Sequence, residues 1–189
     1  MIEIVLRPII LSLVIFLARL CYVLYVIHKD GRCGDDKSTK KYPRKKRRNP
    51  SCTIVVLGSG GHTSEMFSLL QGISSSRYYP LIHIVASTDV TSEDRVLAAA
   101  KMASELLPQR TIKIPRSREV GQSYITSIMS TLHAFLYSFW IVARLRPNLV
   151  ICNGPGTCLP VVFCTFIWRI LGWCEGKVVF VESFCRVQR

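Results

Sequence analysis

Beyond residue 50, short apolar runs rich in Val and Ile alternate with longer segments of helical periodicity. Near-continuous apolar runs of this length are typical of strands buried on both faces of a sheet. They predict strands at residues 53–57, 81–86, 111–114, 148–152 and 177–182. The segments between them predict helices at residues 63–70, 92–106, 123–145 and 159–171. Strands that alternate with helices pair in parallel, so we predict an α/β fold: a Rossmann-like parallel sheet with flanking helices.

The helix predicted at residues 123–145 carries an apolar stripe opposite a face of small and hydroxyl side chains. The stripe comprises Ile125, Ile128, Met129, Leu132, Leu136, Phe139, Trp140 and Ala143. The opposing face comprises Ser127, Ser130, Thr131, Ala134 and Ser138. Packing of the stripe into the core is the default expectation. The aromatic residues of this helix leave open a second arrangement, in which part of it lies on a bilayer surface.

Residues 8–27 form a separate apolar segment of the length that a helix needs to cross a bilayer. Its single charged residue, Arg19, lies two-thirds of the way along, where a long side chain can snorkel or face a partner. A cleaved signal peptide, an interfacial helix and a buried helix are the alternatives. Glu3 before the segment and bulky residues at its end disfavour a signal peptide. We therefore predict a retained transmembrane helix.

The net charge of +13 is concentrated in one stretch. Residues 28–50 hold ten Lys or Arg against three Asp, which accounts for +7 of the total. A nuclear localisation signal or a nucleic-acid patch would have this composition, but next to a span it is explained by a stop-transfer linker attracted to anionic lipid. The positive-inside rule places the N-terminus in the lumen and the rest in the cytosol. We predict an anchor (1–28), a basic linker (29–50) and a globular domain (51–189), with no nucleic-acid partner.

The eight cysteines form no C-x-x-C pair, and several lie within apolar runs. This pattern disfavours both a zinc site and a secreted disulfide framework, and favours reduced, buried thiols in a cytosolic domain. We expect no metal and no cofactor.

A glycine-rich turn follows the first predicted strand, with Gly58, Ser59, Gly60 and Gly61 before His62. Glycines let the backbone approach a ligand closely, and the helix that follows, capped by Thr63 or Ser64, points its first N–H groups there. A phosphate or pyrophosphate site is the interpretation that we favour, with a purely structural turn as the alternative. The P-loop lysine is absent, and Thr63 stands where a dinucleotide site needs its third glycine, so ATP and NAD are disfavoured.

His62 is the candidate catalytic residue of this turn. An imidazole in the first turn of a helix lies in a positive field that favours its neutral, proton-accepting form. The alternative is a helix-capping histidine without a chemical role.

Ligands of open parallel sheets bind beyond the carboxyl ends of the strands, where three further loops carry polar residues. The candidate phosphate-binding residues of the later glycine loop are Asn153, Gly154, Gly156 and Thr157. Asp89 is a candidate for orienting a sugar hydroxyl or His62, and Glu182 for acid/base chemistry. Their alternatives are a tight turn, a helix cap and a salt bridge from Glu182 to Arg186.

Four ordered motifs carry a resemblance that covers nearly the whole chain: Gly58–Met66, Ser87–Asp89, Asn153–Thr157 and Val181–Arg186. With the N-terminal apolar segment, they resemble the membrane-anchor subunit family of the two-subunit UDP-N-acetylglucosamine transferase of asparagine-linked glycosylation. That family is similar to the acceptor-binding half of the bacterial lipid-linked GlcNAc transferase of peptidoglycan synthesis.

The resemblance implies one half of a GT-B glycosyltransferase on the cytosolic face of the endoplasmic reticulum. The acceptor would be dolichyl-pyrophosphate-GlcNAc, with its pyrophosphate on the Gly58–Thr63 and Asn153–Thr157 loops and His62 as the base. A soluble subunit would bind the UDP-GlcNAc donor, so this chain alone is not expected to be active. Family members continue beyond the Val181–Arg186 motif, so a C-terminally truncated form with altered partner binding is also expected.

Two rivals come from other functional classes. One is a non-catalytic recruiting scaffold whose glycine loop is only structural. The other is a membrane-tethered nucleotide-dependent oxidoreductase, which the missing third glycine makes improbable. A Ser-His-Asp hydrolase has no support, because the chain lacks a Gly-x-Ser-x-Gly elbow.

Overall fold

The computed structural model describes residues 2–32, 50–58, 61–71, 73, 76–89, 110–117, 122–154 and 156–182. The helix predicted at residues 92–106 lies outside these ranges, as do Ser59 and Gly60 and most of the basic linker.

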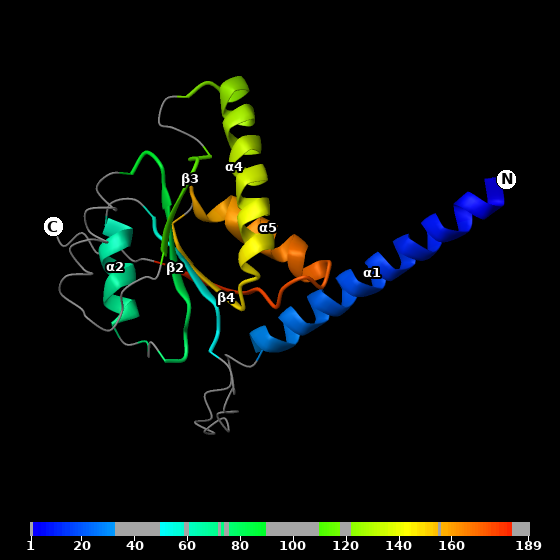
Figure 1. Ribbon diagram of the computed structural model, residues 1–189, viewed down its shortest axis with the longest axis horizontal. Helices are drawn as coiled ribbons and strands as arrows, with labels where there is room; N and C mark the ends of the chain where they lie inside the picture. Colours follow the sequence, from blue (N-terminus) through cyan, green and yellow to red (C-terminus); the bar gives the residue numbers. More distant parts are fainter. Residues whose placement is uncertain are drawn as a thin grey trace.

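Within the described residues, five parallel strands form one sheet in the order β3-β2-β1-β4-β5 (Figure 1). The strands are β1 (Thr53–Val56), β2 (Leu81–Ala86), β3 (Arg110–Ile114), β4 (Leu149–Asn153) and β5 (Lys177–Val181). Every predicted strand is confirmed, with ends shifted by one residue at most. The strand order reverses between β1 and β4, and the carboxyl ends of such a pair are where Rossmann-like sheets bind ligands.

Helices cover both faces of the sheet. The first, α2 (Gly61–Leu70), packs on one face over Val55, Leu57 and Val85. On the other face, α4 (Tyr124–Leu145) and α5 (Cys158–Ile170) cover Ile54, Val56 and Ile84. Alternate residues of each strand therefore enter opposite halves of the core, as the pleat requires. The Rossmann-like prediction is confirmed.

The predicted core packing of the α4 stripe is wrong for most of its residues. Ile125, Leu132 and Trp140 are exposed, whereas Ala134 and Ser138 of the opposing face are buried. Their small side chains let α4 lie close to α5, and Trp168 Nε1 and Trp173 Nε1 donate to the Phe139 and Ala143 carbonyls of α4 at 3.0 and 2.9 Å. At the N-terminal half, Ser130 Oγ and Thr131 Oγ1 both donate to Ser117 O at 2.9 Å. Hydroxyl and small side chains thus form the inner face.

The N-terminal helix α1 (Ile2–Arg32) projects away from the domain (Figure 1) and is apolar enough over Arg7–Lys29 to span a membrane. The length and composition of α4 also suit a span, but α4 contributes Ile141 and Val142 to the core. One transmembrane helix before the domain therefore agrees with the prediction.

Arg19 makes α1 part of the folded structure. Its Nε donates to the carbonyl of Ile170, the last residue of α5, at 3.3 Å. The C-terminus of a helix carries a partial negative charge, which stabilises a guanidinium placed there. Gly172 accommodates this contact, because a Cβ at Gly172 would lie 2.9 Å from Arg19 Nη2. The charged residue in the apolar segment thus has its partner in the domain.

His83 of β2 is fully buried beneath α2, with its ring 5.8 Å from that of Phe67. Neither ring nitrogen has a hydrogen-bond partner in the part of the chain that the structure describes. Because burial penalises the charged imidazolium, the pKa of His83 is lowered from 6.5 to about 4.

We predict that His83 makes the protein acid-sensitive. In the unfolded chain the ring gains a proton near pH 6.5, whereas in the folded chain it stays neutral down to about pH 4. The free energy of unfolding should therefore fall as the pH drops through this window, by about 3 kcal/mol in total. Thermal unfolding in detergent, followed from about pH 7 to about pH 4, measures this loss. His83→Leu should flatten the curve between those limits; an unchanged pH dependence in this variant would contradict the assignment.

Candidate functional site

The candidate site forms where β1 and β4 end side by side. Gly58 follows β1, and a Cβ at this position would lie only 2.6 Å from the backbone oxygen of Asn153, the last residue of β4. Real Cβ atoms do not approach an oxygen so closely, so the two chain segments can meet in this way only with glycine at residue 58. This contact brings the two predicted glycine loops together.

His62 lies between the two loops. A Cβ at Gly154 would lie 3.6 Å from His62 Cδ2 and 3.5 Å from Gly58 Cα. Gly154 has φ +90°, a conformation that glycine adopts without strain. The structure therefore brings Gly58, His62, Asn153 and Gly154 together as the sequence predicted, with His62 partly exposed.

Glu65 was not predicted, yet it belongs to this group. One of its carboxylate oxygens lies 3.8 Å from His62 Nδ1, and Asn153 Nδ2 donates to that oxygen at 3.5 Å and to His62 O at 3.3 Å. A carboxylate beside Nδ1 favours the tautomer with the proton on Nδ1 and leaves Nε2 as the basic nitrogen. The three-residue spacing of His62 and Glu65 is too common in helices to have indicated this, and the contact with Asn153 is made only in the folded chain.

Asn153 is 1% exposed, and its Oδ1 has no hydrogen-bond partner among the described residues. A buried, unsatisfied amide oxygen is unfavourable unless a ligand or water completes it. Asn153 thus lies at the candidate site, with its amide nitrogen bonded to α2 and its amide oxygen without a partner among the described residues, and its phosphate-binding role stays a prediction.

Two helix N-termini meet at this edge. Helix α2 begins at Gly61, two residues earlier than predicted, so the interpretation of Thr63 or Ser64 as its cap is wrong. The buried Thr63 hydroxyl instead donates to Gly58 O and closes the turn. Helix α5 begins after Thr157, whose side chain makes no capping hydrogen bond, and Gly156 O accepts from Ser117 Oγ at 3.3 Å. Converging N–H groups with positive dipole ends suit an anion.

Cys158 supports the floor of the site. Its thiol donates to Asn153 O at 3.4 Å, and the hydrogen bond with Cys152, together with burial, raises the pKa of Cys158 well above its usual range. A neutral thiol in this position is a structural donor, which agrees with the expectation of reduced, buried cysteines.

The remaining predicted residues lie at the same edge, farther from His62 along the sheet. Asp89 follows β2 in a turn where its N–H donates to Ala86 O at 3.0 Å, and the exposed Glu182 directly follows β5. The orienting role of Asp89 and the acid/base role of Glu182 stay predictions. Arg186, the alternative partner of Glu182, and Ser59 and Gly60 lie outside the described residues. Within the described ranges, no group of three His, Cys, Asp or Glu side chains is arranged to hold a metal ion.

Comparison with known proteins connects this arrangement with a family. Residues 53–189 match the model of the family described as "Oligosaccharide biosynthesis protein Alg14 like". The chain belongs to the Alg14 family.

Members of the Alg14 family with curated names resemble most of the chain. The human UDP-N-acetylglucosamine transferase subunit ALG14 is 40% identical over 141 residues, which cover 71% of this chain and 65% of the human protein. The rat protein of the same name is 39% identical with the same coverage. The Yarrowia lipolytica protein is 31% identical over 178 residues, 94% of this chain and 78% of its own length. The chain thus spans 65% of the rat and human relatives. The names and α1 together indicate a membrane-associated Alg14-family protein.

We predict that two alanine substitutions in the glycine loops differ sharply in effect. Gly58→Ala forces a Cβ against the Asn153 backbone and should lower the free energy of unfolding by about 1 to 3 kcal/mol. Gly156→Ala is the matched control, because no described atom beyond its chain neighbours lies within 4 Å of its Cβ position, and it should change stability by less than about 0.5 kcal/mol. Chemical unfolding of both variants measures the difference; equal stability would contradict the close approach of β1 and β4.

Proposed function

We propose that this chain is the membrane-anchoring, acceptor-binding subunit of a UDP-GlcNAc transferase that adds the second GlcNAc to dolichyl-pyrophosphate-GlcNAc. The observation that carries the proposal is the meeting of the Gly58 and Gly154 turns, two helix N-termini and His62 at one edge of the sheet. Membership of the Alg14 family and the names of the human and rat relatives support it. Protein N-glycosylation is the process that this reaction would serve.

The domain supplies half of a GT-B active site. The described part of the domain forms one parallel sheet, whereas a GT-B active site is enclosed by two facing Rossmann-like domains. A soluble donor-binding subunit would complete the cleft, and this chain would recruit it to the membrane. The basic residues 28–50, which directly follow the apolar segment 8–27, support a lumenal N-terminus and a cytosolic domain at the endoplasmic reticulum.

The two helix N-termini would bind the pyrophosphate of the acceptor. The first N–H groups of α2 and α5 have no carbonyl of their own helix to which they could donate, so phosphate oxygens would accept hydrogen bonds from them. The buried Asn153 Oδ1 would receive a hydrogen bond from the acceptor sugar or from an ordered water. Asp89 and Glu182 would contact the sugar from the neighbouring strand ends, Asp89 as an orienting residue.

His62 would act as the general base. Its Nε2 would take the proton of the acceptor hydroxyl while the hydroxyl oxygen bonds to the anomeric carbon of the donor GlcNAc and the bond from that carbon to UDP breaks. Glu65, on the Nδ1 side at 3.8 Å, would hold the ring in the required tautomer and stabilise the imidazolium that forms. The UDP leaving group would be stabilised by the donor-binding subunit.

We predict that His62→Gln, assembled with the donor-binding subunit, lowers the turnover of GlcNAc transfer by about 10²- to 10⁴-fold, the usual contribution of a general base. Glutamine keeps the approximate size and hydrogen bonding of the ring but cannot take a proton. Transfer from UDP-GlcNAc to a pyrophosphate-linked GlcNAc lipid is the assay, with co-purification of the two chains as proof of assembly.

His28→Gln is the matched control for this measurement, because His28 lies on α1, outside the domain. It should leave turnover unchanged. Normal turnover in a folded and assembled His62→Gln complex would exclude His62 as the base.

A non-catalytic recruiting scaffold is the second candidate. The contact between Gly58 and the Asn153 backbone favours it, since this contact requires glycine whether or not a ligand binds. In that case the donor-binding subunit, tethered to membranes by an unrelated transmembrane helix, would transfer GlcNAc without this chain. Absence of transfer by the tethered subunit would exclude the scaffold.

A further inference from the structure

Helix α4 presents a continuous apolar surface to the outside of the domain. We define the α4 face as its outward side chains Ile125, Ile128, Met129, Leu132, Leu136 and Trp140, all of which are exposed, Ile125 to 80%. Phe135 lies beside them and stacks edge-on with the exposed Phe163 of α5 at 5.4 Å, so the apolar surface continues onto α5. Apolar surface of this extent marks an interaction site.

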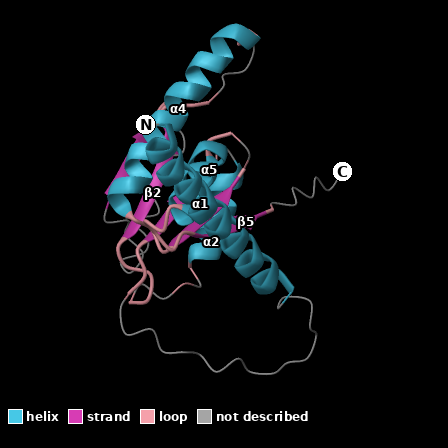
Figure 2. Cartoon of the chain, turned by 90° about the vertical axis from the view of Figure 1, so that its right-hand side faces the viewer, coloured by secondary structure: helices cyan, strands magenta, loops and turns pink. Residues whose placement is uncertain are grey.

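The position of α1 indicates what covers this surface. Helices α4 and α5 lie on the side of the sheet from which α1 projects, and α2 lies on the opposite side (Figure 1). Figure 2, seen from the side of α1, shows α1 and α5 in front of the strands. The α4 face therefore belongs to the half of the domain that is turned toward the membrane of α1.

The contact between α1 and α5 sets the depth of the domain. Arg19 and the buried Val23 contact the domain, and both lie within the apolar stretch Arg7–Lys29. With 31 residues, α1 is about 46 Å long, whereas the hydrocarbon core of a bilayer is about 30 Å thick. The domain thus meets α1 inside its apolar stretch, and the exposed Leu171 and Trp173 after α5 lie at the same level. This holds α4, packed on α5, at the bilayer surface.

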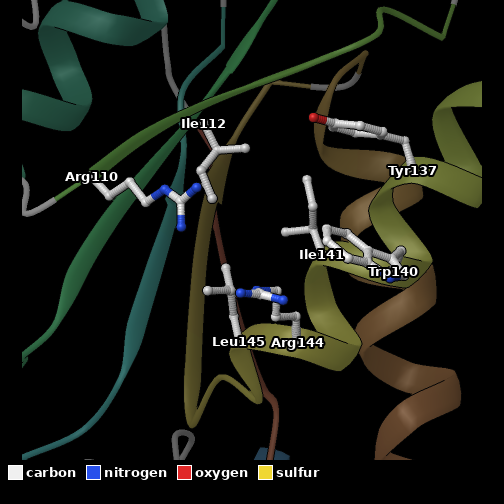
Figure 3. A pocket seen from close by; sticks show the side chains of 7 residues that line it. All are labelled: Arg110, Ile112, Tyr137, Trp140, Ile141, Arg144 and Leu145. Atoms are coloured by element: carbon white, nitrogen blue, oxygen red, sulfur yellow. The ribbon is translucent and has the colours of Figure 1, made fainter.

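A pocket at the C-terminal end of α4 adds charge to the apolar surface. It has a volume of about 230 Å³ and lies between β3 and α4. Figure 3 shows Arg110 reaching from β3 toward Ile112 and Ile141, with Arg144, Tyr137 and Trp140 on the α4 side. The Arg144 guanidinium lies 5.5 Å from the Trp140 ring centroid. Arginine with tryptophan and tyrosine is the combination that anchors proteins at the headgroup level of a bilayer, where guanidinium groups bind phosphate.

We propose that the α4 face lies in the interfacial layer of the bilayer spanned by α1, and that Arg110 and Arg144 bind a phospholipid phosphate there. The apolar stripe supplies the buried area, and the arginine pocket supplies complementary charge. This second membrane contact is independent of whether the chain takes part in GlcNAc transfer.

The orientation has a consequence for the candidate site. Near its N-terminus, α4 binds Ser117 through Ser130 and Thr131, and Ser117 in turn binds Gly156 of the site. Arg110, the first residue of β3, lies at the other end of the strands, the amino-terminal end. The α4 face therefore runs along the membrane from the arginine pocket to the site, which lets a lipid-borne ligand enter from the bilayer.

Photo-cross-linking of the full chain tests this contact without an activity assay. Leu132 is replaced by p-benzoylphenylalanine, and the chain is reconstituted in nanodiscs of phosphatidylcholine and phosphatidylserine. The matched control is Leu69 of α2, which is 49% exposed against 52% for Leu132 but lies on the opposite side of the sheet (Figure 1). After irradiation, mass spectrometry should find lipid adducts several-fold more often at Leu132 than at Leu69.

Two outcomes would overturn the proposal. One is equal lipid labelling at both positions. The other is a protein adduct instead of lipid when the Leu132 form is irradiated in native membranes, which would show that a protein covers α4.

The arginine pocket is tested with the same label placed at Tyr137, which lines it. We expect phosphatidylserine to exceed its share of the nanodisc among these adducts, and Arg144→Gln to reduce this excess several-fold. Arg77→Gln removes the charge of an exposed arginine that does not line the pocket, and it should leave the excess intact. The lipid-phosphate assignment fails if the two variants behave alike.

Discussion

The candidate site depends on one contact, that of Gly58 with the backbone of Asn153. Through it, β1 and β4 end within a few ångströms of each other at the point where the strand order reverses. Helix α2 begins soon after β1 ends, and α5 begins equally soon after β4 ends, so their N-termini converge on one spot. Any side chain at residue 58 would push the strand ends apart and separate the two positive helix ends, which together attract an anion better than either alone.

On the side of the sheet that α4 covers, the usual distribution of side chains in a soluble domain, with large apolar residues inside, is reversed. Small residues of α4, Ala134 and Ser138, lie inside, and large apolar residues lie outside. Two indole N–H groups fix the approach of α4 to α5 by donating to α4 carbonyls. Close helix packing through small residues is common where the surroundings of a helix pair are apolar.

Much of the fold could be predicted from local sequence. The strand positions followed from Val- and Ile-rich runs such as residues 53–57, because a fully buried strand leaves no polar alternation to mislead. The inner face of α4 could not be predicted in this way, since periodicity identifies an apolar stripe without stating whether core or lipid covers it. Tertiary contacts to Ser117 and α5 determine which face of α4 turns inward.

The candidate site could likewise be predicted only in part. The glycine loops and His62 were predictable, since a parallel sheet must bring the ends of its strands to one edge. Glu65 was not, because its carboxylate becomes relevant only when Asn153, 88 residues away in the chain, donates to it. The start of α2 was misplaced because Thr63 resembles a helix cap, whereas its hydroxyl bonds backward to the carbonyl of Gly58.

The hydrogen bond from Arg19 to the end of α5 joins the anchor helix to the domain by a folded contact as well as by the linker. A domain joined to its membrane anchor by a flexible linker alone samples many heights and tilts relative to the bilayer. Only a few of these orientations would present a binding site to a molecule in the membrane. The contact of α1 with α5 restricts changes in the height and tilt of the domain. Lateral diffusion and rotation about the membrane normal stay unrestricted. If the acceptor is lipid-borne, as we propose, encounter with it would be a search within the plane of the membrane, and part of the orientational entropy of binding would already be lost when the chain folds.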